Sequence, residues 1–194
     1  MSTTTAIDFR LVRPRQFGQA QFEIRGFDRR RIDAALPARL TPYLKKARTL
    51  TNFVKRTILF SRPGVAILRT FFCARRTVLH QGEAAGFYEM IRPHTAARPN
   101  KYNFVLTGER MIAGKIRPWS DPVNWMLGKH ILLSGYSPDV RFAGEFWKTP
   151  DGALHFNTNS GTYAPADETL PAVERVMSKL FPGARIVAEK RGAT

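Results

Sequence analysis

Two side chains in the segment 129–165, Glu145 and His130, are candidates for acid–base chemistry. Carboxylates and imidazoles are groups that enzymes commonly use to transfer protons near neutral pH. Glu145 lies in the alternating stretch DVRFAGEFW, in which Arg141 is expected to point to the same side, and Lys129 directly precedes His130. We predict Glu145 and His130 as the catalytic residues of a site that also binds an anionic group.

The polar residues near this pair could bind the anion. Short polar side chains and a glycine occupy residues 157–163, and such a turn can present backbone N–H groups to a phosphate. The predicted ligand-binding residues are Arg141, Asn157, Asn159, Ser160, Gly161, Thr162 and Tyr163. Plainer roles stay open, because Arg141 and Glu145 could form a surface ion pair worth ~0–1 kcal/mol. His130 could equally be a core histidine, and 159–163 a structural turn.

A β-hairpin would bring these residues together. The stretches DVRFAGEFW and ALHFNTN both alternate between apolar and polar residues, and the loop 150–152 separates them. A three-residue loop places Phe146 opposite Phe156, whereas a loop of two or four residues sets apolar residues against polar ones. On the other face, the predicted pairs are Glu145 with Asn157 and Trp147 with His155. The predicted polar face carries Arg141, Glu145, His155 and Asn157.

The same segment resembles a poorly characterised domain of bacterial effector-like proteins and polymorphic-toxin C-terminal regions. In that pattern a histidine precedes a hairpin with A-G-E, and S-G-H-Y-x-P follows. The matching residues here are His130, Ala143-Gly144-Glu145, Ser160-Gly161-Thr162-Tyr163 and Pro165. The resemblance implies an effector-like role, with or without enzymatic activity. Thr162 stands where the commoner form has histidine, so a catalytic role of that histidine would not carry over to this chain.

The charge of the chain is strongly positive and uneven. The 194 residues include 31 Lys+Arg and 15 Asp+Glu, a formal net charge of +16. Residues 1–80 hold 17 basic and 4 acidic residues, and residues 81–194 hold 14 and 11. Such an excess favours a nucleic acid or another polyanion as partner, although a solvated surface or a basic secretion or chaperone-binding region would look the same. The predicted polyanion-binding residues are Arg29, Arg30, Arg31, Lys45, Lys46, Arg48, Lys55, Arg56, Arg69, Arg75 and Arg76.

The composition excludes several classes of site. Cys73 is the single cysteine, so an internal disulfide and a cysteine-based zinc site are ruled out. The four histidines lack metal-ligand spacing, and we expect no metal and no cofactor. Charged residues interrupt the most apolar stretch, 53–79, so we expect no membrane span, and the N-terminus has no signal-peptide pattern. We expect a cytoplasmic protein, or one delivered to another cell as an effector, and the oligomeric state stays open.

Periodicity predicts an α+β fold in two parts. Residues 1–80 would form a basic, mainly helical region, and residues 81–194 a small antiparallel sheet with flanking helices. The predicted strands are 21–27, 86–93, 101–108, 109–116, 139–147, 153–159 and 184–189. The predicted helices begin at about Arg29, with Asp28 as cap, cover 49–60 and 65–79, begin again at Asp121, and cover 169–181.

Two functions are compatible with these features. The first is a polyanion-binding protein, whose basic N-terminal third holds nucleic acid or a phosphorylated ligand. The alternative is a small effector-like transferase or hydrolase that acts on a nucleotide-like or phosphorylated substrate, with Glu145 as acid–base group.

Overall fold

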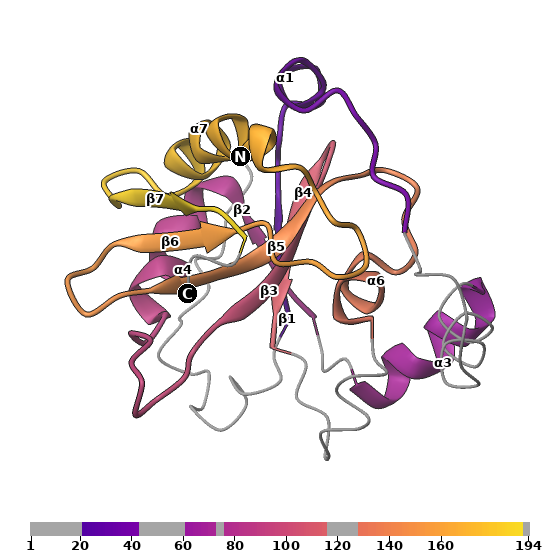
Figure 1. Cartoon of the computed structure of the whole chain (residues 1–194), viewed down its shortest axis with the longest axis horizontal. Coiled ribbons are helices and arrows are strands. Elements are labelled where there is room, and N and C mark those ends of the chain that lie inside the picture. The colour runs from indigo at the N-terminus through magenta and orange to yellow at the C-terminus, as the bar shows by residue number, and fades with distance from the viewer. Residues whose placement is uncertain (1–20, 43–60, 73–75, 116–127, 192–194) are drawn as a thin grey trace, which may run out of the picture.

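The computed structural model describes residues 21–42, 61–72, 76–115 and 128–191, and for residues 71, 72 and 76 it describes the backbone only. In this part of the chain, seven strands form one mixed sheet in the order β2-β1-β4-β3-β5-β6-β7 (Figure 1). The strands are β1 (Gln21–Arg25), β2 (Arg76–His80), β3 (Tyr102–Thr107), β4 (Arg110–Gly114), β5 (Val140–Lys148), β6 (Leu154–Asn157) and β7 (Ile186–Glu189). The helices are α1 (Arg29–Ala35), α3 (Arg62–Phe72), α4 (Ala84–Met90), α6 (Lys129–Ser134) and α7 (Leu170–Leu180). Two 3-10 turns, η3 (Gln81–Glu83) and η4 (Asp167–Thr169), precede α4 and α7.

The sheet corrects the predicted architecture. The fold is α+β, but the small antiparallel sheet after a helical N-terminal part is wrong. Strands β1 and β2 both come from the first 80 residues, they pair in parallel, and β1 joins them to β4. At the other edge β6 and β7 are also parallel. Segments on both sides of residue 80 therefore share one sheet.

Two segments adopt the opposite secondary structure from the predicted one. Residues 76–79 were expected to end the helix 65–79, but the helix ends at Phe72, and these residues together with His80 form β2. Two β-branched residues, Thr77 and Val78, favour this strand, and pairing with β1 stabilises it. A strand was expected at 86–93, but residues 86–90 belong to α4, which buries Ala84 and Phe87 on one face. The predicted helices at 49–60 and after Asp121 lie outside the described residues.

Other elements agree with the sequence pattern. Asp28 caps α1, because its carboxylate accepts a hydrogen bond from the Arg30 backbone at 3.0 Å. The hairpin around Thr107-Gly108, the helix α7 and the strand β7 are confirmed. The register of the β5–β6 hairpin is confirmed too, and Gly152 in its loop has φ +84°. The observed pairs are Glu145 with Asn157, Phe146 with Phe156, and Trp147 with His155.

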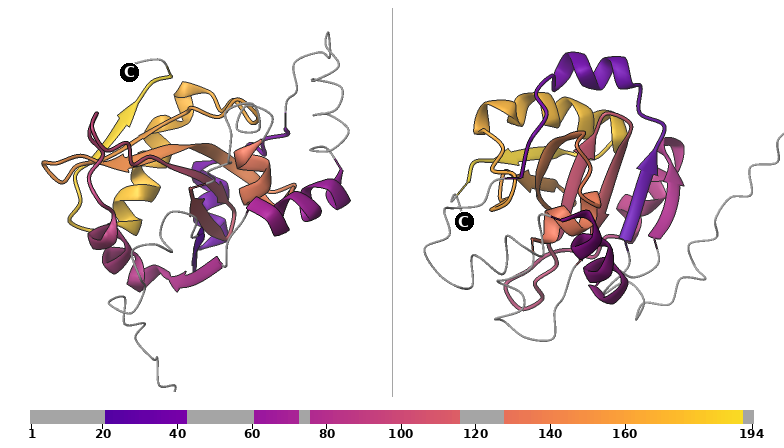
Figure 2. Two further views of the ribbon diagram at one scale, coloured as in Figure 1. Left: turned by 90° about the horizontal axis from the view of Figure 1, so that it is seen from below. Right: turned by 90° about the vertical axis from the view of Figure 1, so that its right-hand side faces the viewer.

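The two faces of the sheet are covered differently. One face packs its phenylalanines against α4 and α7, and we call it the α7 face. The other, the α6 face, is covered near its centre, where α6 buries Ile131 and Leu132 against Val105 and Ala143. Helix α3 lies beside α6, at the end of the molecule away from α4 (Figure 2). The part of the α6 face beyond α6 carries polar side chains.

A β-bulge separates Arg141 from this polar part. Leu106 pairs with Phe142 and Thr107 with Val140, so Arg141 has no partner in β3. Val140 consequently packs with the apolar residues of the α6 face, whereas strict alternation along β5 would place it on the same face as Phe142.

Candidate functional site

Five side chains form a polar platform on the α6 face. Asn103 of β3 pairs with Glu145 of β5, and Glu145 pairs with Asn157 of β6. Trp147 of β5 pairs with His155 of β6, one step further along the strands. Because side chains two residues apart share a face of a sheet, these five residues lie on one surface in two adjacent rows. We use the name polar platform for Asn103, Glu145, Trp147, His155 and Asn157.

Trp147 is the centre of one row and is almost fully buried, at 4% exposure. The His155 ring stacks on the indole with a centroid distance of 5.7 Å and an interplanar angle of 27°. His94 meets the indole edge-on at 6.1 Å, and the Lys101 ammonium lies 4.2 Å from the centre of the ring. Two imidazoles and an ammonium thus surround one aromatic ring.

His155 is held by a carboxylate as well as by the indole. Its Nδ1 lies 2.6 Å from Oε1 of Glu189 in β7. Since the carboxylate only accepts, Nδ1 carries the hydrogen, and the neutral ring has its free lone pair on Nε2. The side chains are partly open to solvent, with exposures of 20% for His155 and 21% for Glu189.

His94 is fixed by its own loop. The backbone N–H of Asn100 donates to His94 Nδ1 at 2.8 Å, and the His94 backbone N–H donates to the Lys148 carbonyl at 2.6 Å. Burial lowers the pKa of His94, and the Lys101 charge lowers it further, against an opposing effect of Glu145. His94 is therefore largely neutral at pH 7.

Glu145 and its neighbours form the second row. The Asn159 side-chain amide donates to Glu145 Oε2 at 3.0 Å. The Asn157 side-chain oxygen accepts from the Glu145 backbone N–H at 3.2 Å and from the Asn159 backbone N–H at 3.0 Å. Asn157 thus supplies the hydrogen-bond partner that β5 needs where β6 ends. The predicted pairing of Glu145 with Asn157 is present, and Asn159 also contacts Glu145.

Lys129 is the first residue of α6, and its ammonium interacts electrostatically with Glu145 of this row. Its side chain is partly buried, and burial lowers its pKa, while the negative charge of Glu145 acts in the opposite direction. Within the described ranges, the Lys129 ammonium makes no hydrogen bond and no ion pair closer than 4.0 Å. A partly desolvated cation without a bonded anion is electrostatically unsatisfied.

His130 lies in the core and does not reach the platform. Its Nε2 donates to the Gly144 carbonyl at 2.9 Å. Burial lowers the pKa of His130 to about 4, so the ring is neutral at pH 7. The contact satisfies a backbone carbonyl of β5, which is the role of a core histidine.

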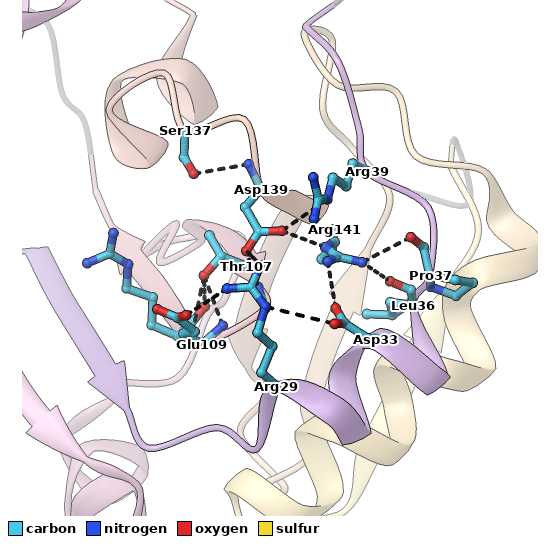
Figure 3. Close-up of polar contacts among 12 residues, drawn as sticks. Arg29, Asp33, Leu36, Pro37, Arg39, Thr107, Glu109, Ser137, Asp139 and Arg141 are labelled. Atoms are coloured by element: carbon cyan, nitrogen blue, oxygen red, sulfur yellow. Dashed lines mark hydrogen bonds and ion pairs between the residues drawn. The ribbon is translucent and has the colours of Figure 1, made fainter.

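Arg141 is buried at the other end of β5 and belongs to an ion-pair network (Figure 3). Its guanidinium donates to Asp139 at 2.9 Å and to Asp33 at 2.6 Å. It also donates to the backbone carbonyls of Leu36 and Pro37 at 2.9 and 3.0 Å. Four of the five N–H groups of the guanidinium are used within the protein, and they join β5 to α1.

The turn 159–163 is anchored to α6 rather than open. The buried Tyr163 hydroxyl lies 2.9 Å from the Ser134 hydroxyl, and burial raises the pKa of Tyr163 to about 12. Ser160 is fully buried, and its hydroxyl accepts the Tyr163 backbone N–H at 3.2 Å. Gly161 is exposed and Thr162 half-exposed. Of the seven residues predicted to bind a ligand, Asn157 and Asn159 lie beside Glu145.

The basic residues predicted to bind a polyanion have several environments. Arg29 donates to Glu109 at 2.7 Å and to Asp139 at 3.3 Å, so its charge is paired within the protein. Arg30 is exposed on α1, and Arg31 pairs with Asp28 at 3.2 Å. Arg69 of α3 packs beside Gly135. Lys45, Lys46, Arg48, Lys55, Arg56 and Arg75 lie outside the described residues, and of Arg76 only the backbone is described.

Three residues of this surface were not predicted from the sequence. His94 and Lys101 come from the segment between α4 and β3, and Glu189 comes from the last strand. Lys101 had a weak local signal, because it alternates with the buried Tyr102 and so shares a face with Asn103. His94 and Glu189 had none, since only the long-range pairing of strands brings them to the hairpin.

Comparisons with protein-family models, curated proteins and solved structures give no match for this chain. Among the described residues, no three His, Cys, Asp or Glu side chains are grouped so that they could hold a metal ion. In the same ranges, each helix is too short or too polar to cross a membrane.

Proposed function

We propose that this protein binds a phosphate-bearing polyanion, and that the polar platform with Lys101 and Lys129 forms part of the contact surface. The observation that carries the proposal is Lys129. Burial makes its charged form costly, and no hydrogen-bonded anion of the described part offsets that cost. A phosphate beside this ammonium would supply the missing charge-assisted hydrogen bonds.

The surroundings of Lys129 support the same ligand chemistry. The Lys101 ammonium lies over Trp147, and its charge adds to the effect of burial in lowering the pKa of His94. Asn159 is exposed, and its amide lies beside the Glu145 carboxylate. Lysines bind phosphates, while amides and carboxylates can bond to the edges of unpaired bases, so single-stranded nucleic acid fits this surface.

The wider setting of the proposal comes from the sequence. The formal charge of +16 favours association with nucleic acid, and a single cysteine suits a reducing compartment such as the cytoplasm. The pattern KH…AGE…SGTYAP supports an effector-like role, including delivery into another cell.

Anisotropy of a fluorescent single-stranded oligonucleotide tests the proposal. We expect the affinity to fall steeply between about 50 and 200 mM salt, because bound phosphates release counterions. Lys129→Gln and Lys101→Gln should each weaken binding and reduce the salt slope by about 1. Lys179→Gln is the matched control, because Lys179 is exposed on α7, on the opposite side of the sheet. Affinity that does not depend on salt, or equal effects of all three substitutions, would contradict the proposal.

The alternative, an effector-like transferase or hydrolase acting on a phosphorylated substrate, keeps Glu145 but lacks most of the partners that the sequence suggested for it. His130 and Arg141 bond elsewhere in the protein, and Ser160 is buried. Enzymatic activity on this surface therefore needs other partners for Glu145 or a different proton acceptor.

A further inference from the structure

We infer that His155, held by Glu189, is a general base on the polar platform, and that its substrate is single-stranded RNA. The inference rests on the proposed polyanion binding and extends it to a reaction. The nucleophile is the 2′-hydroxyl of the RNA itself, which lies next to the phosphodiester that it attacks.

The geometry of His155 carries this inference. Glu189 accepts the Nδ1 hydrogen at 2.6 Å, and Trp147 stacks on the ring, so both the tautomer and the plane of the imidazole are set. A carboxylate that orients an imidazole in this way is the recurring arrangement of histidine bases. In the part of the chain that the structure describes, Nε2 of His155 makes no hydrogen bond, and the side chain is 20% exposed. The proton-accepting atom is therefore free for a ligand.

The groups near His155 are suited to binding a nucleotide. Lys101 lies over the same indole that His155 stacks on, so an ammonium and an imidazole belong to one row of the sheet. Glu145 and Asn159 occupy the adjacent row, where their carboxylate and amide can bond to a base edge. Phosphate binding, contact with the nucleobase and proton transfer would then occur on one surface.

The reaction balances without a further reactant. His155 Nε2 accepts the 2′-hydroxyl proton while the 2′-oxygen forms a bond to the adjacent phosphorus. The bond from phosphorus to the 5′-oxygen breaks, and the leaving oxygen takes a proton from solvent, which reaches this partly exposed surface. Lys101 would stabilise the negative charge on the phosphorus oxygens in the transition state. The products are a 2′,3′-cyclic phosphate and a 5′-hydroxyl, and the imidazolium then returns its proton to solvent.

Three oligonucleotides of one sequence test this reaction on the full chain: RNA, 2′-O-methyl RNA and DNA. We expect all three to bind with a similar dependence on salt, and only RNA to be cut, with a cyclic phosphate on the product. His155→Gln should lower the cleavage rate by about 10²-fold or more, which is far more than any loss in its affinity for the 2′-O-methyl strand. His80→Gln is the control, because it removes an exposed imidazole from β2 at the far edge of the sheet.

Glu189→Gln provides the second variant. Glu189 is a positioning residue in this scheme, so its substitution should lower kcat and leave KM unchanged, whereas a merely structural contact would leave kcat at the wild-type value.

Each outcome decides between the two proposals. Binding of all three strands without cleavage of RNA overturns the inference and leaves the binding function standing. Failure of all three strands to bind overturns the binding function, and the inference with it. Cleavage that persists in His155→Gln at the wild-type rate shows that His155 is not the base.

Discussion

The ion-pair network around Arg141 and the polar platform around Glu145 contain the same types of charged side chain in opposite states. In the network, Arg141 is buried and bonded to four oxygen atoms, and Arg29 joins Glu109 to Asp139 (Figure 3). Beside the platform, Lys129 is partly buried without a bonded anion, and Lys101 lies over the Trp147 indole.

This difference separates charges that hold the fold from charges that are available to a ligand. A buried guanidinium with its donors satisfied fixes the position of α1 against β5. Partial burial of the Lys129 ammonium costs free energy, and no bonded anion offsets that cost. Lys129 therefore does not stabilise the fold as Arg141 does, and a role in binding explains its position better. The sequence does not distinguish the two states, since Arg141 and Glu145 lie four residues apart on one strand.

The largest expected change in stability is for a substitution in the ion-pair network around Arg141. Arg141→Met removes the guanidinium that donates to Asp33, Asp139 and two backbone carbonyls, so we expect a loss of about 3–5 kcal/mol in the free energy of unfolding. Urea unfolding followed by circular dichroism measures it. Arg175→Met, at an exposed position of α7, should change stability by less than about 0.5 kcal/mol. A loss below about 1 kcal/mol for Arg141→Met would show that the network is not structural.

A smaller effect is expected at the glycine of the A-G-E sequence. A Cβ at Gly144 would lie 1.9 Å from the Asn157 carbonyl oxygen, so the end of β6 must move away from β5. Gly144→Ala should therefore cost about 1–3 kcal/mol in urea unfolding and weaken oligonucleotide binding. Gly161→Ala is the matched control, because a Cβ there meets nothing within 4 Å and we expect no loss. Equal stability of the two variants would contradict the close contact between the strands.

Local patterns were enough for the hairpin that positions Glu145. Phe146 and Phe156 are buried opposite each other, whereas a register shift by one residue would have set Phe146 against a polar residue. The same reasoning failed for residues 76–80, where a short apolar run suits a helix or a strand equally well. Their pairing with β1 decides the outcome, and β1 lies about fifty residues earlier in the chain.

Only the residues of the site that lie in or next to the β5–β6 hairpin could be predicted from the sequence. Glu145, Asn157 and Asn159 follow from the alternation and the register. His155 meets Glu189 only because β7 returns in parallel beside β6, a pairing without a local signal. The bulge that removes Arg141 from the platform depends on β3, and it too lies beyond the reach of a two-residue period.

The smallest expected effect on stability concerns Lys129 and has the opposite sign to that of Arg141. Burial lowers the pKa of Lys129, so the folded protein releases this proton more readily than the unfolded chain. Stability contributed by this group therefore rises with pH between the folded pKa and the unfolded value of about 10.4. Lys129→Met should remove that slope and raise the free energy of unfolding near pH 7 by about 1 kcal/mol or less, while oligonucleotide binding weakens. Urea titrations of both proteins at a series of pH values measure the difference. A clear loss of stability in Lys129→Met would place Lys129 with the structural charges of the network and remove the contrast between the two regions.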